Sequence, residues 1–108
     1  MSPIYRAVVR GQFADLTPAL REALLAEAGD HEIFKSSYTP AGTFTYERNL
    51  VAFSFRFEVR AVGDDPAAVE AEVIDVASTK AVANLTSWGI GYKYLKVTTT
   101  DMASIWDG

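Results

Sequence analysis

The clearest pattern in the chain is a strict alternation of apolar and polar side chains over residues 52–60. Alternation with a period of two is typical of a β-strand that has one buried face and one exposed face. Residues 3–13, 43–46 and 91–100 are also rich in β-branched and aromatic residues, which favour strands. We therefore expect four strands in these segments, with a turn at residues 39–42.

Two other segments repeat their apolar residues at helical spacing. Each follows a capping residue and begins with a proline, which fits the first turn of a helix. These signals predict one helix over residues 18–28, capped by Thr17, and a second over residues 66–88, capped by Asp65. We expect Gly29 to end the first helix in the left-handed conformation.

The order of these elements is strand, helix, two or three strands, helix, strand. This order predicts an α+β domain over residues 1–108, a ferredoxin-like two-layer sandwich with two helices on one face of a mostly antiparallel sheet. Residues 33–38 would add an extra hairpin strand. Another α+β sandwich with a different strand order fits the same pattern.

Composition and charge exclude several classes of function. The chain of 108 residues has no cysteine, which excludes disulfides and thiolate metal sites, and its single histidine excludes a histidine metal cage. A net charge of -4 disfavours general nucleic-acid binding, and no apolar run is long enough to cross a membrane. The N-terminal residues lack the apolar region of a signal peptide, so we expect a cytoplasmic protein. Nucleotide-, zinc- and calcium-binding motifs are absent, so we expect no cofactor and no metal.

The best functional signal is the distribution of basic residues over the two faces of the predicted sheet. If the phenylalanines of residues 52–60 face the helices, the period of two sends five of the ten basic residues to the other face, with one of the fourteen acids, Glu58. This predicted cationic face carries five basic residues and two tyrosines: Arg6, Arg10, Arg56, Arg60, Lys96, Tyr92 and Tyr94. Arginine pairs with carboxylates and phosphates through two hydrogen bonds, so we expect the face to bind a small anionic or aromatic ligand.

The same distribution is compatible with three alternatives to ligand binding. The face is an ordinary solvated sheet face, or it packs against a second copy of the chain. Alternatively, it binds RNA as ferredoxin-like RNA-recognition modules do, although the aromatic motif of those modules is absent.

His31 and Lys80 are the candidate catalytic bases. His31 lies between two acids, which could orient it, but a cationic side chain is also favourable at the end of the first helix. Lys80 lies within the apolar arc of the second helix, where a buried amine could act as a base. A lysine at such a position more often extends its ammonium group into water.

Three strand sequences resemble those of a family of small, functionally uncharacterised actinobacterial proteins: YRAVVRGQF at 5–13, FSFRFEVRA at 53–61 and GYKYLKVTTTDM at 91–102. The resemblance covers nearly the whole chain and brings no catalytic residues with it. More loosely, the layout is similar to that of dimeric α+β barrel proteins, which include monooxygenases, cyclases and ligand-binding proteins.

Two functional hypotheses follow. The first is a self-associating domain that binds a ligand on its sheet face; the second is a cofactor-independent enzyme of the dimeric barrel type, with His31 or Lys80 as base. A purely structural interaction module is a third. The second helix carries more apolar surface than one sheet can cover, and the C-terminal residues add Met102, Ile105 and Trp106, so we expect a homodimer.

Overall fold

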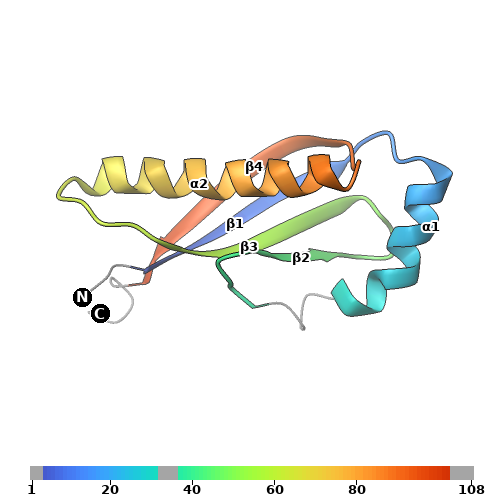
Figure 1. Cartoon of the computed structure of the whole chain (residues 1–108), viewed down its shortest axis with the longest axis horizontal. Helices are drawn as coiled ribbons and strands as arrows, with labels where there is room; N and C mark the ends of the chain where they lie inside the picture. The colour runs from blue at the N-terminus through green and yellow to red at the C-terminus, as the bar shows by residue number, and fades with distance from the viewer. Residues whose placement is uncertain (1–3, 32–36, 103–108) are drawn as a thin grey trace.

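The computed structural model describes residues 4–31 and 37–102 as an α+β arrangement of four strands and two helices (Figure 1). In chain order, the elements are β1 (Ile4–Phe13), α1 (Pro18–Glu27), the short 3-10 helix η1 (Ala28–His31), β2 (Thr43–Tyr46), β3 (Ala52–Arg60), α2 (Pro66–Ser87) and β4 (Tyr92–Asp101). The predicted strands and helices are confirmed to within a residue or two at their ends.

The strands form one antiparallel sheet in the order β2-β3-β1-β4. Strand β1 is central and pairs with β3 along almost its whole length, from Ile4 opposite Arg60 to Gln12 opposite Ala52. Paired residues in an antiparallel sheet point to the same face, so this register decides which side chains share a surface.

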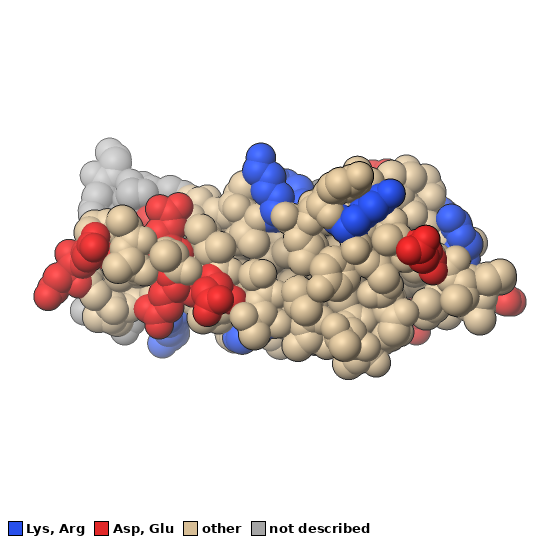
Figure 2. Space-filling model, turned by 90° about the horizontal axis from the view of Figure 1, so that it is seen from above, with Lys and Arg blue, Asp and Glu red and all other residues tan. Residues whose placement is uncertain are grey.

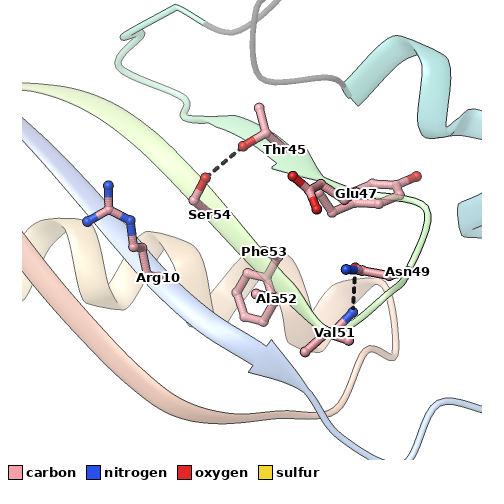
Figure 3. Close-up of a pocket in the computed structure, with 9 residues that line it drawn as sticks. Arg10, Thr45, Glu47, Asn49, Val51, Ala52, Phe53 and Ser54 are labelled. Atoms are coloured by element: carbon pink, nitrogen blue, oxygen red, sulfur yellow. Dashed lines mark hydrogen bonds between the residues drawn. The ribbon is translucent and has the colours of Figure 1, made fainter.

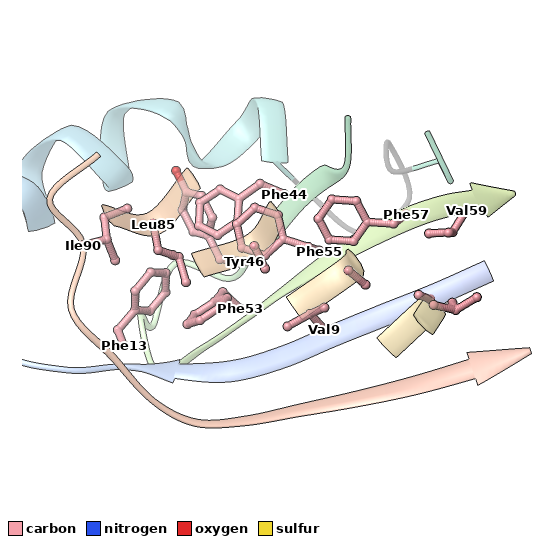
Figure 4. Close-up of a cluster of buried hydrophobic side chains, with 14 of the residues drawn as sticks. Val9, Phe13, Phe44, Tyr46, Phe53, Phe55, Phe57, Val59, Leu85 and Ile90 are labelled. Atoms are coloured by element: carbon pink, nitrogen blue, oxygen red, sulfur yellow. The ribbon is translucent and has the colours of Figure 1, made fainter. Parts of the chain in front are cut away.

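One face of the sheet is covered by α2, which crosses β1, β3 and β4. The helix buries a straight line of residues spaced four apart: Val69, Val73, Ala77, Ala81 and Leu85. Beneath it lie Phe55 and Phe57, which are 1% and 0% exposed, among the aromatic rings of β2 and β3 (Figure 4). The apolar half of the alternation over residues 52–60 therefore forms the core, as predicted.

Helix α1 departs from the prediction that both helices lie on the sheet face. It stands across the end of the sheet farthest from the two termini (Figure 1), and of its own residues only Leu24 is buried. Thr17 caps it as expected, accepting a hydrogen bond from the Leu20 amide at 3.2 Å. Gly29 does not end it in the left-handed conformation, because the chain tightens directly into η1. No helix in the part of the chain that the structure describes is both long and apolar enough to cross a membrane.

The predicted turn at residues 39–42 packs against the core. Gly42 has a φ of 91°, and a Cβ atom at this position would overlap the Phe57 ring. Thr39 forms an isolated parallel bridge to Phe57, and the Lys80 ammonium donates to the Pro40 carbonyl at 2.9 Å. Most of the extra strand expected at residues 33–38 lies outside the described residues, and the described residues 37–38 are not in a strand.

The first prediction concerns this core. Phe57→Ala should lower the free energy of unfolding by about 3–5 kcal/mol, because it removes buried apolar surface and leaves a cavity under α2. Val62→Ala is the control, since Val62 is 75% exposed and its truncation should cost less than about 0.5 kcal/mol. Urea unfolding measures both variants. A loss below about 1 kcal/mol for Phe57→Ala would mean that the two faces of the sheet have been assigned the wrong way round.

Candidate functional site

The face of the sheet opposite α2 carries an array of basic side chains. Arg10 of β1 pairs with Lys96 of β4 on one side and with Ser54 of β3 on the other. Two residues further along β3, Arg56 lies opposite Val8. The strand pairing places six of the ten basic residues here, and we call this set the cationic face: Arg6, Arg10, Arg56, Arg60, Lys93 and Lys96.

A β-bulge in β4 changes the predicted membership of this face. The pairing of β1 with β4 shifts between Arg10 and Gln12, so that Lys93 lies opposite Gln12 and Tyr92 lies opposite Phe13. Strict alternation from Lys96 back along the strand predicted Tyr92 on the cationic face. The extra residue at the bulge moves Tyr92 to the opposite face of the sheet. Lys93 takes its place, and Tyr92 lies on the side of the sheet that carries α2.

Tyr94 is the residue at the bulge. Its φ of 58° is left-handed, which is uncommon for a residue other than glycine, and its side chain is 74% exposed. The Lys93 ammonium lies 5.4 Å from the centre of the Tyr94 ring. Gly11 faces the bulge from β1, where a Cβ atom would come within 2.7 Å of Leu95 and 2.8 Å of Phe53. A glycine inside a strand is typical of a bulge, and Gly11 lies opposite this one.

Two arginines of the cationic face share one aromatic ring that the sequence did not indicate. The guanidinium carbon of Arg6 lies 4.7 Å from the centre of the Tyr38 ring, and that of Arg56 lies 5.6 Å from it. An aromatic ring attracts a guanidinium group to its face, and it restricts the directions in which the group can move. Tyr38 therefore contacts the guanidinium groups of two arginines that come from different strands.

A hollow of about 400 Å³ lies at one end of the cationic face, beside the β2–β3 hairpin (Figure 3). Arg10 borders it, and the hydroxyl groups of Thr45 and Ser54 are hydrogen-bonded to each other at 2.6 Å within it. Glu47 and Asn49 line the side nearest the turn, where the Asn49 side chain accepts a hydrogen bond from the Val51 amide at 3.2 Å. The hollow thus combines one cation, two hydroxyl groups and one carboxylate.

Acidic residues are concentrated elsewhere. Seen from above, carboxylates gather at the end of the molecule where α2 begins (Figure 2). Burial raises the pKa of the Tyr5 phenol beneath this end of α2, and the negative charges of Asp101 and Glu70 raise it further. An acidic chain has therefore separated its charges, with cations over one sheet face and anions around the start of α2.

The two candidate bases do not join the cationic face. His31 ends η1 and stacks on Tyr46, whose partner in the sheet is the core residue Phe53. It therefore lies on the side of the sheet that carries α2. Lys80 is exposed on α2 and bonded to the Pro40 carbonyl. The sheet therefore separates both residues from the arginines of the cationic face. Among the described residues, no group of His, Asp and Glu side chains could hold a metal ion.

Comparison with known proteins supplies the identity of the chain at the level of a family. The model of a family of unknown function, DUF6204, matches residues 1–106. The chain belongs to the DUF6204 family. The match confirms the resemblance of its strand sequences to an uncharacterised family, and nothing in it bears on an actinobacterial origin or on barrel proteins. No curated protein and no solved structure matches this family member.

Proposed function

We propose that this DUF6204 protein binds a small organic anion, a carboxylate or a phosphate ester, on its cationic face. The observation that carries the proposal is the placement of Arg6 and Arg56 against the same Tyr38 ring, at 4.7 and 5.6 Å. Each guanidinium group carries a planar fork of N–H donors that matches the geometry of a carboxylate or phosphate, and here two such groups lie against one ring.

The charge distribution on the strands supports the same proposal. Arg10 and Lys96 lie directly opposite each other, and like charges in that position destabilise a sheet. Glu58, opposite Arg6, is the single acid that the strand alternation places among these cations. A bound anion would relieve the repulsion between the cations and would add charge-assisted hydrogen bonds.

We further propose that the fold is ferredoxin-like. The order strand-helix-strand-strand-helix-strand and the central antiparallel position of β1 between β3 and β4 support this class. In this assignment α1 is displaced from the sheet face to the end of the sheet, and the turn at residues 39–42 covers Phe57 instead.

Self-association also belongs to the proposal, through the outer edge of β4. This strand has a neighbour on one side only in the described sheet, and it is 10 residues long. Lys93 and Lys96 protect the first half of the edge, whereas residues 97–100 carry no charge. An antiparallel pairing of two copies about a two-fold axis near Thr99 would continue the sheet. Direct packing of two cationic faces is disfavoured because it would oppose like charges.

The prediction for the anion site is a saturable titration. Inorganic phosphate and benzoate, each added at constant ionic strength, should shift the NMR signals of the Arg6 and Arg56 side chains and of the Tyr38 ring. Arg56→Ala should weaken binding at least about tenfold, because it removes one of two charge-assisted donors. Arg56→Lys should not restore it, since lysine lacks the planar fork.

Arg21→Ala is the matched control, because it makes the same change in net charge on the exposed surface of α1. It should leave the affinity within about twofold, since exposed charges more than about 8 Å away are largely screened at physiological salt. If Arg21→Ala weakens binding as much as Arg56→Ala, or if the shifts are scattered and follow ionic strength alone, the face is an ordinary solvated surface and the proposal fails.

The prediction for self-association is tested by light scattering at micromolar concentration. The protein should have twice its chain mass of 11.8 kDa, and the double variant Thr98→Lys/Thr100→Lys should be a monomer because it charges the open part of the edge. Thr79→Lys/Thr86→Lys adds the same charge to exposed positions of α2 and should remain a dimer. A wild-type protein that scatters as a monomer, or a control that dissociates equally, contradicts pairing through β4.

A further inference from the structure

A second hollow, of about 450 Å³, lies on the other side of the sheet, where α1, β2 and the end of α2 meet. Its walls are largely aromatic and aliphatic. Trp88 is 45% exposed, and the centre of its ring lies 5.1 Å from that of the Phe44 ring; Tyr46 and Ile90 also line the hollow. Glu27 and His31 stand at the rim, one helical turn apart.

The hydrogen bonds of His31 define what its ring can offer to a ligand. Its Nδ1 atom lies 2.8 Å from the Phe44 carbonyl oxygen, which can only accept a hydrogen bond. In the neutral ring, Nδ1 therefore carries the proton, and Nε2 presents a lone pair. Stacking on Tyr46, with the ring centres 5.2 Å apart, holds the imidazole in this orientation.

The polar groups at the rim are acceptors that face each other. The His31 Nε2 atom lies 4.0 Å from Glu27 Oε2, which is too far for a hydrogen bond but leaves room for one donor group to contact both atoms. The Tyr46 hydroxyl is not available as a donor, because it donates to the Leu24 carbonyl at 2.6 Å. Burial, with the charges of Glu27 and Asp30, raises the pKa of this phenol, so it keeps its proton at neutral pH.

The charges and aromatic rings around the hollow favour a donor group that is positively charged. Among the residues that the structure describes, those that line the hollow include the carboxylate of Glu27 and no lysine or arginine. The exposed face of the Trp88 indole attracts cations, as a carboxylate does. A neutral alcohol carries one hydrogen and can satisfy one of the two acceptors, whereas a protonated amine carries enough hydrogens to satisfy both.

We propose that this hollow is a binding site for a protonated primary amine attached to a small aromatic or aliphatic body. The ammonium group lies between Glu27 and His31 and donates to both, and the apolar body packs against Trp88. The site is separate from the cationic face and takes a ligand of the opposite charge. Its test therefore does not depend on whether the anion site exists.

The test uses three probes of similar size that differ in charge. The full-length protein is titrated with phenethylammonium chloride, 2-phenylethanol or sodium 3-phenylpropionate at constant ionic strength, and the NMR signals of the Trp88 indole and the His31 ring are followed. The indole signals are assigned with Trp106→Phe, since the chain has two tryptophans. We expect saturable shifts with the ammonium probe at millimolar concentration, binding at least about fivefold weaker with the alcohol, and weaker still with the carboxylate.

Glu27→Gln keeps the shape of the side chain and removes its charge, so it should weaken binding of the ammonium probe about fivefold or more. Its side chain is 69% exposed, so the substitution should not disturb folding. Glu22→Gln is the matched control on the same helix outside the hollow, and it should change the affinity less than about twofold. The proposal is overturned if the carboxylate probe binds as tightly as the ammonium probe, if Glu27→Gln binds like the wild type, or if no probe gives saturable shifts.

Discussion

The burial of one sheet face beneath α2 is the constraint on which the other features of this protein depend. Side chains alternate between the faces of a strand, so placing Phe55 and Phe57 under the helix commits Arg56 and Glu58 to the opposite side. A shift of one residue in the pairing of β1 and β3 would bury arginines and expose phenylalanines, at a cost of many kcal/mol. The hydrophobic core therefore determines where the cationic face lies.

The two candidate sites arise where the structure departs from ideal repetition. At the cationic face, the turn that precedes β2 brings Tyr38 over two arginines, and a bulge adds Lys93. At the other site, α1 leaves the sheet face uncovered near β2 and leaves a hollow bordered by His31 and Trp88. Both sites thus combine a rigid sheet with a segment that is not part of it, which is the usual way in which a scaffold carries a binding function.

The sequence predicted those features that local chemistry controls. The alternation over residues 52–60 was enough to assign the core, and the pairs Thr17-Pro18 and Asp65-Pro66 located both helix starts, because a cap acts within one turn. Tyr38 could not be found in this way, since its contacts are with residues far along the chain. Gly11 was a signal for the bulge, but its effect on Tyr92 required the register of β4. The position of α1 is set by packing at the end of the sheet, and apolar residues at helical spacing do not indicate which part of a sheet a helix will contact.

The proposed anion site depends above all on the position of Tyr38, on the face opposite α2 and in contact with both Arg6 and Arg56. Nuclear Overhauser effects from the Tyr38 ring protons measure this position directly in the free protein. We expect contacts from the ring to the side-chain methylene protons of both arginines, since the guanidinium carbons lie 4.7 and 5.6 Å from the ring centre. Contacts from Tyr38 to the buried face, such as to the Phe57 ring or to α2, with none to either arginine, would contradict this placement.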